Sequence, residues 1–247
     1  MSKELHINTI LAQAGIKSDE ATGALVTPLH FSTTYQHPEF GQSTGFDYTR
    51  TKNPTRSKAE EVLAAIESAD YALATSSGMS AIVLAFSVFP VGSKVLAVRD
   101  LYGGSFRWFN QVEQEGRFHF TYANTEEELI AELEKDVDVL YIETPTNPLM
   151  LEFDIEKLAK LAHAKGAKVV VDLSLIHILG IVNENLGTIF LSENFHTTRN
   201  TGCCDSFFDV LKTCSQTETG KSSSDCIFLV EVANQLNIII TSEFPSC

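Results

Sequence analysis

The sequence predicts an α/β fold with a largely parallel, buried sheet. In residues 57–172, apolar runs of strand length alternate with longer segments whose apolar residues recur at helical spacing. The strand-like runs are continuously apolar, which is typical of strands that helices cover on both faces. Polar motifs follow four of these runs, at the carboxyl ends of the strands, where such sheets bind their ligands.

The predicted elements follow one another closely along the chain. The first helix, 57–67, places its apolar residues three or four positions apart and its glutamates on the other face. Strands are predicted at 70–75, 94–98, 118–122, 137–142 and 168–171, and helices between them at 78–89, 105–115, 125–133 and 154–165. The helix 78–89 is apolar on nearly all sides, which predicts a buried helix.

Local signals mark two helix ends. Thr125 is followed by three glutamates, which suit the positive end of a helix dipole, so we predict a helix that Thr125 caps. Gly166 is expected to end the helix 154–165, because glycine readily takes the left-handed conformation that closes helices.

The chain divides into three predicted regions. Residues 1–56 lack the alternation and are expected to form an extended N-terminal arm. The arm contains Pro28, His30, Pro38, Gly41 and Gly45. The domain 57–172 follows the arm, and a tail of different character covers 173–247. All five cysteines lie in that tail, together with only 3 of the 18 Lys and Arg residues.

Composition excludes several classes of protein. A chain of 247 residues with 44% hydrophobic content can bury a sizeable core, and its net charge of −14 would repel nucleic-acid phosphates. It has no basic cluster for anionic membranes, no apolar stretch of membrane-spanning length and no apolar signal-peptide core at its start. We therefore expect a cytoplasmic protein without nucleic-acid or membrane partners. The odd cysteine count and the absence of CxxC pairs predict neither a disulfide framework nor a metal site.

The segment 76–79 (Ser-Ser-Gly-Met) joins a strand to a helix. Free amides at a helix start, with a glycine that permits close approach, suit a phosphate, although a serine cap and a tight turn explain the segment equally well. The glycine spacings of a Walker loop or a dinucleotide fingerprint are absent, which disfavours an ordinary nucleotide-binding module.

Other strand ends carry further candidates. Tyr102 could stack on a flat heterocycle or be an ordinary half-buried tyrosine, and Asp172 is either a carboxylate at a pocket mouth or a turn residue. In the arm, Tyr48, Arg50 and Asn53 lie in a proline-broken segment, where an arginine beside a tyrosine suits a phosphate.

Together these motifs resemble, in order and spacing, the Cys/Met-metabolism family of pyridoxal-phosphate (PLP) enzymes of fold type I. The matching segments are 48–55 (YTRTKNPT), 76–79 (SSGM), 102–103 (YG), 143–148 (ETPTNP) and 169–172 (VVVD). The resemblance covers residues 1–172 and implies a truncated large PLP domain with helices on both faces of its sheet. The family includes cystathionine gamma-synthase, cystathionine beta-lyase, sulfhydrylases and methionine gamma-lyase.

The resemblance implies a role for each candidate around the cofactor phosphate. The amides around Gly78 and Met79 would hold the phosphate. Tyr48 and Arg50 would reach the same phosphate from a neighbouring subunit, so the family site is shared within a homo-oligomer.

The resemblance also assigns residues to the cofactor ring. Tyr102 would stack on the pyridine ring, and Asn147 would lie near its 3-oxygen. Asp172 would bind the pyridine nitrogen and keep it protonated, which makes the ring a better electron sink.

The resemblance stops after Asp172. The family continues with an Asn-Thr-Phe type of segment and, about two dozen residues later, a Ser-x-Thr-Lys motif whose lysine forms the Schiff base with PLP. Here Lys212 and Lys221 are the only later lysines, and neither lies in that motif, so the chain has no catalytic residue and is expected to be inactive. The family's C-terminal substrate domain is also expected to be missing.

The segment 173–178 (LSLIHI) suggests a cause for this break. It spells the peptide encoded by the mosaic-end adapter of transposase-based DNA libraries, which favours an artefactual or unrelated tail over a frameshifted gene or an unusual fusion. We expect 173–247 to add no native strands and to leave the strand ending at Asp172 without its usual neighbours.

The predicted function is therefore a fragment of a transsulfuration enzyme similar to cystathionine gamma-synthase, acting on a small amino-acid substrate. That activity would be gamma-replacement on an activated homoserine with cysteine. Cystathionine beta-lyase or another family lyase or sulfhydrylase is the alternative. A non-catalytic truncated paralogue that acts by docking on an intact subunit is the alternative of another class.

Overall fold

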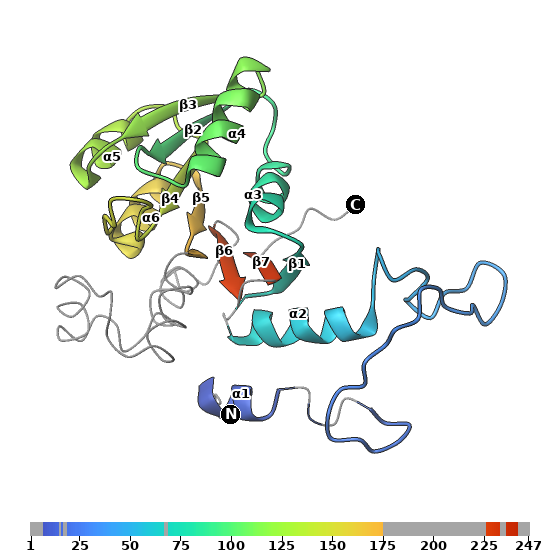
Figure 1. Cartoon of the computed structure of the whole chain (residues 1–247). Coiled ribbons are helices and arrows are strands. Elements are labelled where there is room, and N and C mark those ends of the chain that lie inside the picture. Colours follow the sequence, from blue (N-terminus) through green and yellow to red (C-terminus); the bar gives the residue numbers. More distant parts are fainter. Residues whose placement is uncertain are drawn as a thin grey trace. The chain divides into compact units, whose positions relative to one another are not determined.

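A computed structural model describes residues 7–14, 16, 19–66, 69–174, 226–232 and 236–241 (Figure 1). The chain forms two compact units, Met1–Ala72 and Leu73–Cys247. Most of the tail that was predicted to be unrelated, 175–225, lies outside the described residues, as do 233–235 and 242–247.

The first unit contains the arm and two helices that contact each other, α1 (Ile7–Ala12) and α2 (Pro54–Ile66). Asn53 starts α2, because its side-chain oxygen accepts a hydrogen bond from the Thr55 amide at 2.9 Å and proline suits the first helical turn. The helix therefore begins three residues earlier than predicted. It groups with the arm in the first unit, whereas the sequence had placed the boundary at residue 56.

The second unit is built on a mostly parallel sheet. Its strands are β1 (Tyr71–Thr75), β2 (Ser93–Val98), β3 (Phe118–Ala123), β4 (Val139–Glu143), β5 (Lys168–Asp172), β6 (Cys226–Val232) and β7 (Leu236–Thr241). Among the described residues they form one sheet in the order β1-β7-β6-β5-β4-β2-β3. The pairs β2–β3, β2–β4, β4–β5 and β5–β6 are parallel, and β6–β7 is antiparallel. The predicted α/β fold with a largely parallel sheet is confirmed.

Four helices connect the strands: α3 (Gly78–Phe86), α4 (Gly103–Gln114), α5 (Glu126–Leu133) and α6 (Ile155–Ala164). The cap at Thr125 is confirmed, since its hydroxyl accepts a hydrogen bond from the Glu128 amide at 3.3 Å. Gly166 ends α6 with a φ of 82°, as predicted. Helix α3 is buried on one face only, through Ala81, Ile82, Ala85 and Phe86, whereas Val83 and Leu84 are exposed, so the prediction of a buried helix holds in part. It stops three residues before the predicted end, ahead of Pro90, which disfavours helix in the residue before it.

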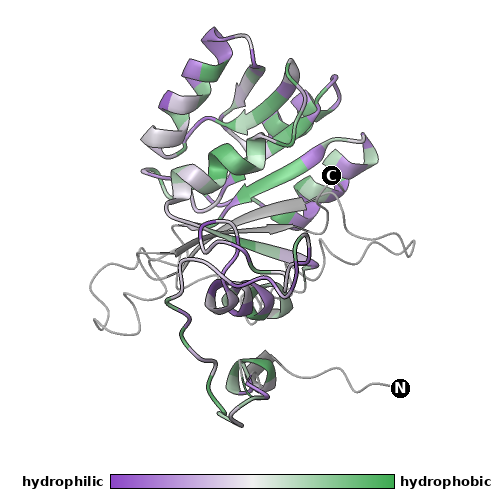
Figure 2. Cartoon of the chain, turned by 90° about the vertical axis from the view of Figure 1, so that its right-hand side faces the viewer, coloured by the Kyte–Doolittle hydropathy of each residue, from purple (hydrophilic) through white to green (hydrophobic). Residues whose placement is uncertain are grey.

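Two pairs of packed helices cover the sheet. The pair α3 and α4 contact each other, and α5 and α6 form the second pair (Figure 1). Figure 2 shows hydrophobic residues concentrated on the strands and hydrophilic residues on the outer helical surfaces. Phe86 of α3 lies at the centre of an aromatic cluster. Its ring contacts Phe89, Trp108, Phe109, Phe118, Phe120 and Tyr141, with centroids 5.2–6.4 Å apart. No helix within the described ranges is long and apolar enough to span a membrane.

The expectation that the tail would add no strands is wrong for 226–232 and 236–241. β6 lies beside β5, with Val169 opposite Cys226 and Asp172 opposite Leu229, so β5 has a neighbour on each side. The runs Ile-Phe-Leu-Val and Ile-Ile-Ile within β6 and β7 explain this, because β-branched and aromatic residues favour strands. The unrelated or artefactual origin of 173–247 stays a prediction.

Candidate functional site

The turn between β1 and α3 is fixed by side-chain hydrogen bonds. The Ser77 hydroxyl accepts a hydrogen bond from the Ser80 amide at 3.1 Å, and the Thr75 hydroxyl donates to the Ser77 carbonyl at 3.0 Å. Gly78 and Met79 are the first two residues of α3. The serine cap is thus present, and the free amides beside it still suit an anion. The phosphate role of Gly78 and Met79 stays a prediction.

Glu143, at the carboxyl end of β4, holds two loops of the second unit. Its Oε2 accepts a hydrogen bond from the Tyr102 amide at 2.8 Å, and its Oε1 accepts one from the Asn147 amide at 3.0 Å. The residue is 4% exposed. The sequence analysis included Glu143 in a motif but not among the candidate site residues. The signal in the sequence that could have identified it is a glutamate that directly follows a continuously apolar, strand-like run.

Asp172 lies next to Glu143 across the sheet, because β4 and β5 pair in parallel with these two residues opposite each other. Its Oδ2 accepts a hydrogen bond from the Tyr141 hydroxyl at 3.0 Å, and its Oδ1 accepts from the Ser174 amide and hydroxyl at 3.1 and 2.6 Å. Both carboxylates are buried. Burial, followed by repulsion from Asp172, raises the pKa of Glu143 to about 8.

The ring of Tyr102 lies against the start of α4. A Cβ on Gly104 would be 2.3 Å from Cε1 of this ring, so only glycine leaves room for it. The tyrosine is 47% exposed, which leaves part of its side chain open to a ligand. Asn147 is also exposed. Tyr102, Asn147 and Asp172 therefore gather around Glu143 at the carboxyl ends of the strands, where the sequence predicted a pocket.

Met79 connects α3 to the same region. Its sulfur accepts a hydrogen bond from the hydroxyl of Ser105, which is fully buried in α4, at 3.9 Å. This contact brings the starts of α3 and α4 together. The sequence analysis missed Ser105 and Tyr141, which are polar groups buried among apolar residues.

Tyr48 and Arg50 belong to the first unit and are described apart from the sheet edge. The Arg50 guanidinium lies over the Tyr48 ring, 5.0 Å from its centroid, and Arg50 is exposed. Their proposed approach to a phosphate from a neighbouring subunit stays a prediction.

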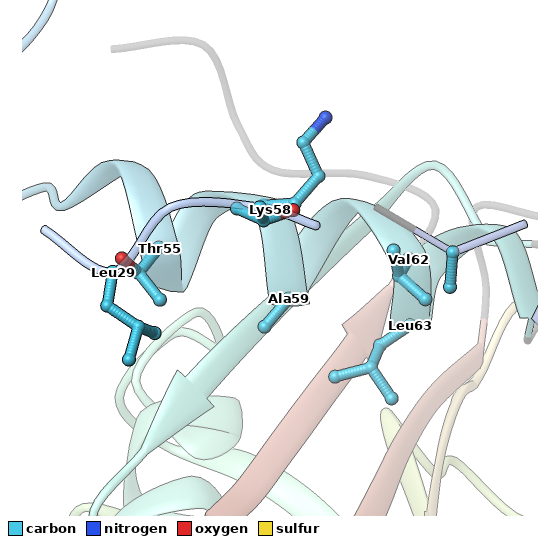
Figure 3. A pocket seen from close by; sticks show the side chains of 8 residues that line it. Leu29, Thr55, Lys58, Ala59, Val62 and Leu63 are labelled. Atoms are coloured by element: carbon cyan, nitrogen blue, oxygen red, sulfur yellow. The ribbon is translucent and has the colours of Figure 1, made fainter. Parts of the chain in front are cut away.

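The first unit also contains a pocket of about 320 Å³ along α2 (Figure 3). Mostly apolar side chains line it, and none of them is a predicted site residue. The lining residues are Ala14, Thr27, Leu29, Thr55, Lys58, Ala59, Val62 and Leu63.

The groups at the carboxyl ends of the strands fit a flat, phosphate-bearing heterocycle. The start of α3 offers free amides for the phosphate, and Tyr102 offers an aromatic face. Asp172 offers a buried carboxylate, which retains lone pairs for a cationic ring nitrogen besides its bonds to Tyr141 and Ser174.

Comparison with known proteins points to one family. A sequence model of the family described as Cys/Met metabolism PLP-dependent enzyme matches residues 8–178. A cystathionine gamma-synthase/O-acetylhomoserine (thiol)-lyase from Bacillus subtilis (strain 168) is 43% identical over 169 residues, which are 68% of this chain and 45% of that protein. A cystathionine gamma-synthase from Haemophilus influenzae is 41% identical over 175 residues, covering 70% of this chain and 47% of the relative.

Solved structures show the same likeness. Cystathionine gamma synthase from Xanthomonas oryzae pv. oryzae, in complex with aminoacrylate and cysteine, superposes with a TM-score of 0.73 at 26% identity. That superposition covers 98% of this chain and 56% of the solved chain. The chain thus spans about half the length of the relatives it matches.

Proposed function

Because the chain belongs to the family of Cys/Met metabolism PLP-dependent enzymes, we propose that it is the cofactor-binding part of a transsulfuration enzyme. The observation that carries this proposal is the gathering of Tyr102, Asn147 and Asp172 around one buried carboxylate at the sheet edge. PLP is the cofactor of this family, and the groups present at that edge suit its phosphate and its ring.

Each residue has one task in the proposed site. The amides of Gly78 and Met79 hold the phosphate at the start of α3. The Tyr102 ring would pack on the pyridine face, and Asn147 would lie beside the ring oxygen. Asp172 would keep a proton on the ring nitrogen of bound PLP, which would supply an electron sink for chemistry at the substrate's alpha carbon.

The proposed oligomer completes this site. In it, Tyr48 and Arg50 of a second copy reach the phosphate. The cation of Arg50, already over an aromatic ring, suits that anion.

The proposed reaction is gamma-replacement on an activated homoserine with cysteine. The names of the relatives from Bacillus subtilis and Haemophilus influenzae both include cystathionine gamma-synthase, which favours this branch, and the first also includes O-acetylhomoserine (thiol)-lyase. Relatives named cystathionine gamma-lyase and beta-lyase are 37% and 33% identical, which keeps an elimination reaction as the alternative.

The chain as written is proposed to bind PLP without catalysing the reaction. Lys212 and Lys221 are the only lysines after Asp172, and neither lies in a Ser-x-Thr-Lys motif. Loss of the lysine removes both the covalent anchor and the group that moves the substrate proton.

A non-catalytic docking function has its own support in the arm. Five large apolar residues there are strongly exposed: Leu25, Val26, Leu29, Phe31 and Phe40. Such side chains favour contact with another subunit over contact with water.

The test is titration of the purified chain with PLP, followed by equilibrium dialysis and by assays for cystathionine formation and cleavage. We expect saturable binding without turnover, and Asp172→Asn should weaken binding at least tenfold because it removes the charge opposite the ring nitrogen. Glu128→Gln, on α5, is the control and should bind as the parent does. Failure of the parent chain to bind PLP, or ordinary turnover, would contradict the proposal.

A further inference from the structure

Glu143 has a place in the site that the sequence motifs do not assign. Its two carboxylate oxygens accept hydrogen bonds from the amides of Tyr102 and Asn147, which belong to two different loops. These loops follow β2 and β4, and they carry the aromatic ring and the amide side chain of the proposed site. One buried carboxylate therefore ties together the two segments that would face the cofactor.

We propose that Glu143 is a positioning residue that holds Tyr102 and Asn147 in the arrangement that PLP requires. This inference rests on the proposed function. Tyr102 is restrained twice, because Glu143 holds its backbone and its ring lies directly against Gly104, where a Cβ would be 2.3 Å from Cε1. Restraint before binding lowers the ordering cost that the cofactor would otherwise meet.

The surroundings of Glu143 make this restraint sensitive to pH. The titratable groups that face it are Asp172 on β5, Asp100 after β2 and Tyr141 on its own strand. Burial and Asp172 raise the pKa of Glu143 to about 8. Below that pH a proton occupies one oxygen and makes it a donor and a poorer acceptor, so the hydrogen bond to one of the two amides weakens.

The central experiment compares the parent chain with Glu143→Gln. Glutamine keeps the shape but presents an NH₂ group, a donor, to one of the two amides. We expect the dissociation constant for PLP, measured by equilibrium dialysis, to rise roughly tenfold to a hundredfold. The amide that faces this NH₂ group, either that of Tyr102 or that of Asn147, should lose protection against hydrogen exchange. We expect the PLP affinity of the parent to improve between pH 7 and 9, and this improvement should flatten in the variant.

Two further variants separate positioning from general stability. Gly104→Ala displaces the Tyr102 ring but leaves Glu143 intact, and alanine is the better helix former. It should weaken PLP binding while both amides stay protected. Glu128→Gln makes the same change at another carboxylate, which accepts from the Asn124 amide at 2.7 Å, and it should leave PLP binding unchanged.

The outcomes distinguish this inference from the proposed function. If Glu143→Gln binds PLP within twofold of the parent and both amides stay protected, the inference is overturned while the proposed function stands. If the parent chain does not bind PLP, both are overturned. If Glu143→Gln does not fold, a pH titration of the parent decides whether the inference holds. The nuclear magnetic resonance signals of the Tyr102 and Asn147 amides should then shift together as the pH passes about 8. Independent movement of the two signals would refute the inference.

Discussion

Two tyrosine hydroxyls of the sheet, on β4 and β3, show how a buried polar group with a hydrogen-bond partner differs from one without. The Tyr141 hydroxyl donates to Asp172 at 3.0 Å, whereas among the described side chains the Tyr122 hydroxyl on β3 is buried without a hydrogen-bond partner. Burial raises the pKa of Tyr141 well above its usual range and that of Tyr122 to about 12, so both hydroxyls remain protonated at neutral pH. The two tyrosines thus differ in whether the buried hydroxyl has a hydrogen-bond partner.

We predict that Tyr141→Phe destabilises the chain by about 1–3 kcal/mol, because it leaves Asp172 with a buried oxygen that has lost a donor. Tyr122→Phe should be neutral or slightly stabilising, since it removes a hydroxyl that is already unpaired. Urea denaturation of the two variants beside the parent measures both effects. Equal losses in the two variants would show that the bond to Asp172 contributes nothing to stability.

Residues whose roles depend on near neighbours were predictable from the sequence. Thr125 and Gly166 act within their own helix ends, and Ser77 caps the helix that it precedes. The roles of Glu143 and Tyr141 were not predictable, because they depend on which residues lie opposite each other across β4 and β5. Strand register is a tertiary property that local spacing does not contain.

Helix α3 packs against both the neighbouring helix α4 and the sheet. Its Phe86 is 1% exposed and contacts rings from α4, β3 and β4. Aromatic side chains bury large areas and prefer tilted or edge-on contacts, as most of these rings show. The apolar character of the buried face of α3 follows from this position, whereas Val83 and Leu84 on its other face are exposed.

Phe86→Ala should therefore cost about 3–5 kcal/mol, through lost burial and the cavity left among the neighbouring rings. Phe40→Ala is the matched control, because Phe40 is fully exposed in the arm and its removal should change stability by less than about 0.5 kcal/mol. Thermal and urea unfolding report both values. A loss below about 1 kcal/mol for Phe86→Ala would mean that the cluster collapses around the gap.

Element types were predictable where a segment was long and its period clear, as for α4 or α6. The short helix α1 was missed because six residues give too little period to detect. The strands β6 and β7 were missed because an apolar run of their length fits a strand or a buried helix equally well, and only a free sheet edge decides between them.

For the whole molecule, the decisive feature is that residues far apart in the sequence complete one sheet. β5 is paired on one side with β4 and on the other with β6, so the part of the chain that resembles the family and the tail meet there. Removal of the tail would turn β5 from an inner strand into an edge strand.

We predict that a chain ending at Ser174 self-associates, because the unpaired backbone of Val169–Asp172 and its apolar side chains would be exposed. A chain ending at Thr241 retains β6 and β7 and should behave as the full chain does. Light scattering after size exclusion distinguishes the two. A soluble, cooperatively unfolding chain that ends at Ser174 would instead show that β6 contributes nothing, as the sequence analysis had expected.

The strand order also bears on how the protein is made. Among the described strands β1 leaves the ribosome first and β7 last, yet the two are neighbours in the sheet. The ribosome therefore releases β2, β3, β4 and β5, which pair with one another, long before β1 can find its place. Until β7 has been made, β1 lacks its neighbour in the sheet, and during that interval chaperones would have most exposed strand surface to protect.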